Sequence, residues 1–193
     1  MEKDMARKNL QRKTAVIVGV LMLVAYSVIG SGNPEAKMMG MLLEAISGIA
    51  VIAIALLMFP ILKPFNKKAS FWYFALRIIE GGLLVVTGIL FLSNNPLLLG
   101  VYDGIHVAHG YIFGIAALIF NFLLYKSKLV PRWLSVFGVI ATLLLLLVNL
   151  LEVTGIVSEL MILKFPIFLN EIVLAIWLIA KGFNRSATTS VTN

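Results

Sequence analysis

The stretch that decides the fold is Ala75–Leu84, which reads ALRIIEGGLL and places an arginine and a glutamate three residues apart. It lies within a hydrophobic run over residues 71–92, which is long enough to cross a bilayer as a helix. At helical spacing, Arg77 and Glu80 leave the same face of that helix. Charged side chains at membrane depth are costly and usually point into a protein interior or a wet cavity. The stretch therefore predicts a membrane protein with a polar interior.

The composition also indicates an integral membrane protein. The chain has 193 residues, of which 61% are hydrophobic and 13% charged, and its mean hydropathy is +1.01. A soluble domain is about 45–50% apolar and about 25% charged. The net charge of +7 comes from basic residues between hydrophobic runs, which favours a basic membrane protein over a nucleic-acid-binding one. Cysteine is absent, which excludes disulfides, thiolate chemistry and Cys-based metal sites.

Six hydrophobic runs predict an all-α, polytopic integral membrane protein folded as a six-helix bundle. Each run has the roughly 20 residues that a hydrocarbon core of about 30 Å requires. We expect membrane spans over residues 14–30, 38–59, 71–92, 102–125, 133–153 and 160–182. The transmembrane domain then covers residues 14–183, after a basic segment over 1–13 and before a polar tail over 184–193 that we expect to be disordered. A cleaved signal peptide is the alternative for the first run, because it ends in the small residues Gly30, Ser31 and Gly32.

Lysine and arginine are distributed unevenly between the two ends of these spans. Thirteen of them flank one side, whereas only Lys37 and Lys164 lie near the other. Basic connections remain in the cytoplasm, so the asymmetry predicts that both termini are cytoplasmic. We expect a multi-pass protein of the cytoplasmic membrane, with the lipid bilayer and no nucleic acid as its partner.

Polar residues within the spans suggest a site. At about 1.5 Å per residue, Glu80 and Glu171 fall near the midplane, with Arg77 on its cytoplasmic side and Glu44 closer to the external surface. If these faces converge, they form a funnel that opens outward and binds a small polar molecule, a lipid headgroup or an ion. The predicted ligand-binding residues are Glu44, Arg77, Glu80, Asn149, Glu152, Asn170 and Glu171. Three buried carboxylates exceed one arginine, so we expect either a bound cation or a proton to restore the balance.

Several alternatives stay open for the same residues. Arg77 and Glu80 also fit a structural ion pair that locks helices together, with Glu171 as a second acceptor. An intramembrane acid/base hydrolase or lipid-modifying enzyme would use Glu44, Glu80 or Glu171 as its catalytic carboxylate. A small proton-coupled transporter and a structural partner subunit are further alternatives, so enzymatic activity is an open question.

Two motifs in the fourth run allow further hypotheses. Asp103, His106 and His109 share one helical face and, with Glu44 or Glu152, supply the ligand types of a divalent metal site. The motif lacks the glutamate of H-E-x-x-H, and histidines near a membrane surface also hydrogen-bond to headgroups or loops. Gly110 and Gly114 form a GxxxG pattern, which predicts close helix packing or a homo-oligomer.

Longer motifs resemble those of a known family. Residues 125–138 read YKSKLVPRWLSVFG and are similar to the central signature of an uncharacterised group of prokaryotic six-span membrane proteins, of the domain of unknown function 4386 type. Residues 166–171, 76–80 and 43–45 fit its other motifs, and the resemblance covers nearly the whole chain between Arg12 and Phe183. It implies the six-span topology and a bacterial or archaeal cytoplasmic membrane, and it carries over no known activity. The motif positions that it implies are Glu44, Arg77, Glu80 and Glu171.

Overall fold

A computed structural model describes residues 2–30, 36–93, 95–156 and 160–184. Within these residues the chain is helical and contains no strand. Six helices are long and apolar enough to cross a membrane, which confirms the predicted all-α six-span class. The elements in order are α1 (Glu2–Ala25), a 3₁₀ helix η1 (Tyr26–Gly30), α2 (Lys37–Leu62), α3 (Lys67–Phe91), α4 (Pro96–Ser127), α5 (Arg132–Val153) and α6 (Met161–Ala180).

Helix boundaries differ from the expected spans mainly at two starts. The helix α1 begins at Glu2, so the basic segment continues the first span instead of preceding it as a separate lead-in. The helix α4 begins at Pro96, because the Asn95 side chain accepts a hydrogen bond from the Leu97 N–H at 2.9 Å and proline suits the first helical turn. In the predicted tail, Asn184 donates its N–H to the Leu129 carbonyl at 2.8 Å, while residues 185–193 lie outside the described residues, as do Ser31 and Gly32.

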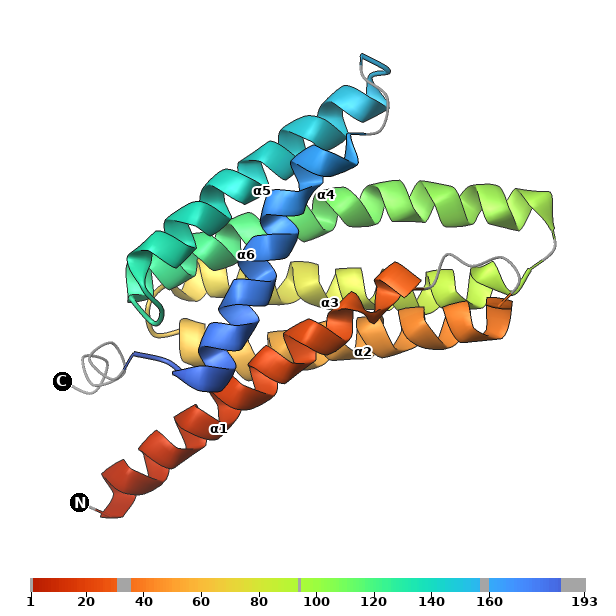
Figure 1. Cartoon of the computed structure of the whole chain (residues 1–193). Helices are drawn as coiled ribbons and strands as arrows, with labels where there is room; N and C mark the ends of the chain where they lie inside the picture. The colour runs from red at the N-terminus through yellow and green to blue at the C-terminus, as the bar shows by residue number, and fades with distance from the viewer. Residues whose placement is uncertain (1, 31–35, 94, 157–159, 185–193) are drawn as a thin grey trace.

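The six helices form a closed ring. Each helix packs against the next one in sequence, and α6 packs against α1. Arg12 of α1 joins these two helices by donating to the carbonyls of Leu178, Ile179 and Ala180 at 3.1, 2.8 and 3.2 Å. It thereby caps the carboxyl end of α6, where a cation is favourable. Towards the opposite end of the bundle, α5 and α6 diverge from α3 and α4 (Figure 1).

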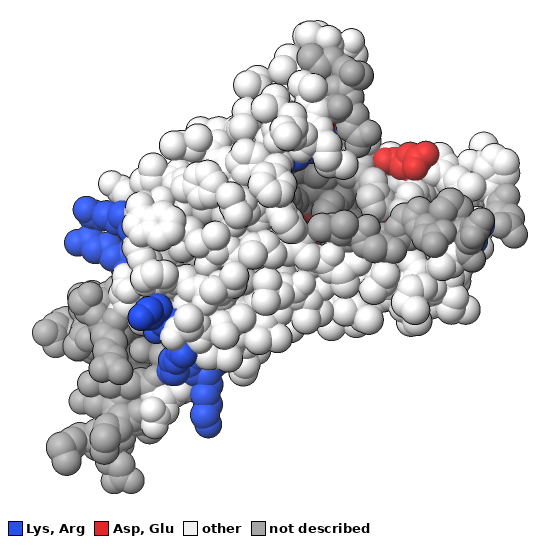
Figure 2. All heavy atoms as spheres, viewed as in Figure 1, with Lys and Arg blue, Asp and Glu red and all other residues white. Residues whose placement is uncertain are grey.

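Basic residues gather at the end of the bundle where α1 starts and α6 ends. Figure 2 shows Lys and Arg atoms there, whereas the acidic atoms on this face lie towards the other end. Most basic connection residues that the structure describes are exposed, as at Lys63, Lys68, Lys126 and Arg132. The uneven charge seen in the sequence is therefore also uneven in space.

Glycine sets the closest approach in the ring. Gly48 of α2 and Gly81 of α3 face each other, and a Cβ on either would lie 2.5–2.6 Å from the carbonyl oxygen of the other. Only glycine permits backbones to meet so closely, as is common between membrane helices. Because Gly81 follows Glu80, this contact places the α3 backbone at Glu80 close to α2.

Candidate functional site

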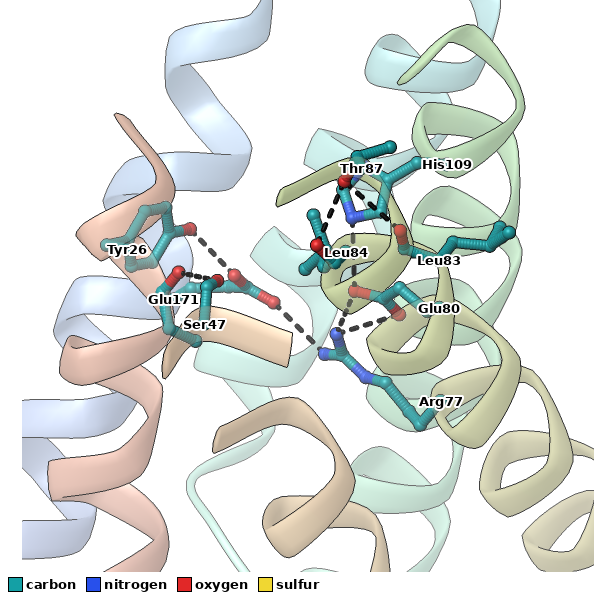
Figure 3. Close-up of polar contacts among 10 residues, drawn as sticks. Tyr26, Ser47, Arg77, Glu80, Leu83, Leu84, Thr87, His109 and Glu171 are labelled. Carbon is teal, nitrogen blue, oxygen red and sulfur yellow. Dashed lines mark hydrogen bonds and ion pairs between the residues drawn. The ribbon is translucent and has the colours of Figure 1, made fainter. Parts of the chain in front are cut away.

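Arg77, Glu80 and Glu171 meet inside the ring and are called here the central charged cluster (Figure 3). The Arg77 Nη1 donates to both carboxylate oxygens of Glu80, at 2.9 and 3.1 Å. The Arg77 Nη2 lies 3.6 Å from Glu171 Oε1, which brings α3 and α6 together. All three side chains are buried. Three residues that the sequence predicted to converge are thus in contact.

Aromatic and polar neighbours hold this cluster in place. The Tyr26 hydroxyl donates to Glu171 Oε2 at 2.7 Å, so η1 takes part in the site. The Arg77 guanidinium lies over two rings, 5.8 Å from the centroid of Tyr73 and 5.4 Å from that of Phe113. Such cation–π contacts are strongest where water is excluded. Arg77 is therefore held by one carboxylate and two aromatic faces.

A cavity of about 160 Å³ lies beside the central charged cluster, and we call it the central cavity. One water needs about 10–15 Å³ of such space, so several waters or a small organic molecule fit. Five of the six helices, together with η1, contribute to its wall. The lining residues are Met22, Ala25, Tyr26, Val28, Ser47, Val51, Ile54, Arg77, Glu80, Leu84, His109, Phe113 and Glu171. Most of this wall is apolar, and its charges are concentrated on one side.

The charges at the central cavity do not balance. Two carboxylates share one guanidinium, and only Glu80 receives hydrogen bonds from it. The His109 Nε2 lies 3.7 Å from Glu80 Oε1 and has no hydrogen-bond partner among the described residues. Buried polar atoms are normally paired, so these groups mark space that water or a ligand completes.

Glu44 belongs to a separate group at α2 and α4. Its Oε1 accepts a hydrogen bond from the Tyr102 hydroxyl at 3.0 Å and lies 3.8 Å from His106 Nε2. The rings of His106 and His109 are 6.3 Å apart, and each histidine faces a different glutamate. Asp103 is exposed. Within the described part of the chain, no three His, Asp or Glu side chains are grouped to hold a metal ion.

Asn149 and Glu152 lie in a second and larger hollow of about 800 Å³, called here the outer groove. Its lining residues are His106, Val107, Gly110, Tyr111, Phe113, Leu145, Asn149, Glu152, Val153 and Lys164. Glu152 Oε2 pairs with Lys164 Nζ at 2.6 Å, and its Oε1 accepts the Leu160 N–H at 2.9 Å. Glu152 thus joins the end of α5 to the start of α6 and does not touch the central charged cluster.

Asn170 likewise points away from its sequence neighbour Glu171. It forms a neutral polar cluster with Asn121, Gly138 and Thr142, between α4, α5 and α6. The Asn170 Nδ2 donates to the Leu134 carbonyl at 2.9 Å, and the Asn121 Nδ2 donates to the Ala117 carbonyl at 2.9 Å. Both amide oxygens lie against Gly138, where a Cβ would overlap Asn121 and lie 2.7 Å from Asn170 Oδ1.

The glycines of the GxxxG pattern face α5 of the same chain. A Cβ on Gly114 would lie 2.5 Å from the Leu146 side chain, and one on Gly110 would lie 3.2 Å from Asn149 Nδ2. Close packing within the chain is therefore one use of this pattern. A homo-oligomer through the same glycines is still a prediction.

Sequence reasoning did not identify three residues that line the central cavity. Tyr26, Ser47 and Phe113 are single aromatic or hydroxyl side chains in apolar runs, where packing residues look the same. Tyr26 reaches Glu171 from η1, and no periodicity in the sequence signals that turn. The only available signal was that a tyrosine hydroxyl in an apolar run needs a hydrogen-bond partner.

Comparisons with known proteins identify a family but no ligand. The family model described as "Domain of unknown function (DUF4386)" matches residues 14–182. A protein from Archaeoglobus fulgidus, described as uncharacterized, is 27% identical over 140 residues, which are 72% of this chain and 81% of that protein. No solved structure matches the chain. The chemistry of the site must therefore be argued from its own geometry.

Proposed function

This chain belongs to the DUF4386 family, and we propose that it is a multi-pass protein of the cytoplasmic membrane whose central cavity binds a small organic cation from the external side. One observation carries the proposal, namely that two buried carboxylates beside the cavity share a single guanidinium.

The geometry of Glu171 favours a cation. Its Oε1 lies 3.6 Å from Arg77 Nη2, which is too long for a hydrogen bond. The Tyr26 hydroxyl donates to its Oε2, but no cation of the described residues donates a hydrogen bond to this buried carboxylate, and a ligand ammonium group would supply both the charge and the bond. Tyr26 and Phe113 add aromatic faces that attract cations.

The rest of the wall favours an organic ligand over an inorganic ion. Met22, Val51, Ile54 and Leu84 are apolar and face the same cavity as the carboxylates. Small-molecule sites typically combine such apolar walls with a few placed polar groups. A small amine with a hydrocarbon body would match both parts of the cavity.

The test is thermal unfolding of the purified protein with a panel of probes. The panel contains the chlorides of methylammonium, ethanolamine and choline, with sodium acetate and sodium phosphate as anions. A ligand that binds only the folded state raises the Tm. We expect at least one of the amines, and neither anion, to raise it in a concentration-dependent way. If no amine raises the Tm, the proposed function is wrong.

Two variants locate the effect. Glu171→Gln leaves Arg77 paired with Glu80 and keeps an acceptor for Tyr26, so it should fold and lose the amine effect. Ser47→Ala removes a polar atom from the same cavity without changing its charge, so it should keep the effect. An amine effect that persists in Glu171→Gln would exclude the central cavity as its site.

The proposed orientation places both termini in the cytoplasm. It is supported by the thirteen basic residues at one end against two at the other. Because the chain lacks cysteine, single thiols can report on it. On intact cells, a membrane-impermeant maleimide should label Thr154→Cys and spare Lys68→Cys, both at exposed positions. The reverse pattern would contradict this orientation.

A proton-coupled transporter is the second candidate. It is favoured by the titratable side chains of His106 and His109, one turn apart on α4, which lie 3.8 Å from Glu44 and 3.7 Å from Glu80. The decisive experiment is uptake of the stabilising amine into proteoliposomes under an imposed pH gradient. Uptake that is lost in His109→Gln would support transport, and binding without uptake would contradict it.

A further inference from the structure

The central cavity and the outer groove share one side chain. Phe113 of α4 lines both, whereas every other residue that lines the central cavity is absent from the wall of the groove. His106 lines the outer groove, whereas His109, which lies one helical turn before Phe113, lines the central cavity. Phe113 therefore lies between the larger hollow and the smaller one beside the charges.

The contacts of Phe113 differ between the two sides of its ring. On the cavity side it faces the Arg77 guanidinium at 5.4 Å and stacks on His109 at 6.4 Å. On the other side it packs against a small cluster of Ala141, Leu145 and Ile167, which is separate from the main core. Phe113 is only partly buried, and it packs against this small cluster from the outside.

We propose that Phe113 is the gate between the outer groove and the central cavity, and that it selects for small organic cations; this inference rests on the proposed function. A cation that passes the ring is attracted to its face, as the guanidinium already is. Beyond the ring it meets the surplus carboxylate of Glu171. An anion gains neither contact, since Arg77 is already engaged by Glu80.

The experiment measures access directly, through thiols placed in a chain without cysteine. Val51→Cys places a thiol in the central cavity, and Val107→Cys places one in the outer groove. Val18→Cys is buried in the core and reports unfolding. Each variant is treated with a methanethiosulfonate reagent that carries a trimethylammonium head, and the rate of modification is followed by mass spectrometry.

The gate predicts a specific response to Phe113→Ala. Modification of Val51→Cys should accelerate by about tenfold, the scale of one desolvated cation–π contact. The rate for Val107→Cys should not change, since that thiol lies in the outer groove. Phe122→Ala removes a phenylalanine from the exposed face of the same helix and should leave both rates unchanged. An unchanged Val51→Cys rate in Phe113→Ala would overturn the gate.

Two further comparisons keep the outcome decisive. If Phe113→Ala makes Val18→Cys reactive, the fold has opened, and the smaller change Phe113→Leu is used instead. Modification of Val51→Cys should also be faster in Phe113→Leu, and an unchanged rate there would overturn the gate. A reagent with a sulfonate head tests the charge preference separately. If the two reagents modify Val51→Cys at equal rates, each relative to its rate at Val107→Cys, the central cavity does not prefer cations and the proposed function is wrong. The comparison of Phe113→Ala with the original chain then still tests the gate.

Discussion

The central charged cluster contains Glu171 and the neutral polar cluster contains Asn170, which is the preceding residue of α6. The two clusters differ in the space next to them. Glu171 points to Arg77 and a cavity of about 160 Å³, whereas Asn170 points to Gly138, where not even a methyl group fits. Both clusters are buried and both connect α6 to other helices. The difference teaches that two adjacent polar residues of one membrane helix can have opposite surroundings, one tightly packed and the other beside open space.

The energetics of the clusters differ in the same way. Asn121 donates to a carbonyl of its own helix, whereas Asn170 donates to a carbonyl of α5, and side-chain hydrogen bonds between membrane helices contribute about 0.6 kcal/mol on average. The charged side chains need a counter-charge, and the described residues supply one guanidinium for two carboxylates. The neutral polar cluster carries no charge that must be balanced, although the Oδ1 atoms of Asn121 and Asn170 accept no hydrogen bond from the described residues, whereas the charged cluster has one more carboxylate than guanidinium.

Removal of Arg77 should produce the largest effect. Arg77→Leu leaves the carboxylates of Glu80 and Glu171 buried without a cation, which costs about 3–5 kcal/mol in comparable cases. We expect a large loss of Tm in detergent, with partial rescue on addition of a stabilising amine. Arg132→Leu, at an exposed position, is the control. An unchanged Tm in Arg77→Leu would show that the two carboxylates do not need Arg77 to neutralise them.

Next comes a difference between the two glutamates. Glu80→Gln removes the negative charge and one of the two oxygens that accept hydrogen bonds from Arg77, and should cost about 1.5–3 kcal/mol of unfolding free energy. Glu171→Gln loses a longer contact, at 3.6 Å, and also removes a buried charge whose desolvation is costly, so its cost should be smaller than that of Glu80→Gln. Denaturant-induced unfolding of the two variants checks the order. Equal losses would mean that Arg77 depends on both carboxylates alike.

Gly138→Ala tests the neutral polar cluster. The added methyl group overlaps Asn121 and lies against Asn170, so overpacking should cost about 1–3 kcal/mol despite the better helix propensity of alanine. Gly82→Ala is the matched control, because a Cβ there meets nothing within 4 Å. We expect the control to keep or raise the Tm. A similar shift in both variants would show that the cluster is loosely packed.

Sequence reasoning predicted the six spans and the shared face of Arg77 and Glu80, because hydropathy and helical spacing depend only on local sequence. Arg77 and Glu80 share a helical face whatever the position of α3 in the bundle. Buried charges also require partners, which made contact with Glu171 an expected outcome. It could not assign Asn149, Glu152 and Asn170, because helix rotation and splay decide which neighbour they meet. Those depend on contacts such as Gly48 with Gly81, between residues far apart in sequence.

The smallest effect on stability is expected from Tyr26→Phe, which also changes the response of the charged cluster to an amine. Tyr26→Phe removes the hydrogen bond to Glu171 Oε2, but water in the adjacent cavity can replace it, so the loss should be about 1 kcal/mol. The same change frees a carboxylate oxygen, so the rise in Tm produced by an amine should be larger than in the original chain. Thr142→Val is the counterpart in the neutral polar cluster, where the hydroxyl donates to the Gly138 carbonyl at 2.7 Å and no amine effect should change. If Tyr26→Phe instead weakens the amine effect, the hydroxyl itself contacts the ligand, and the cation lies nearer η1 than Arg77.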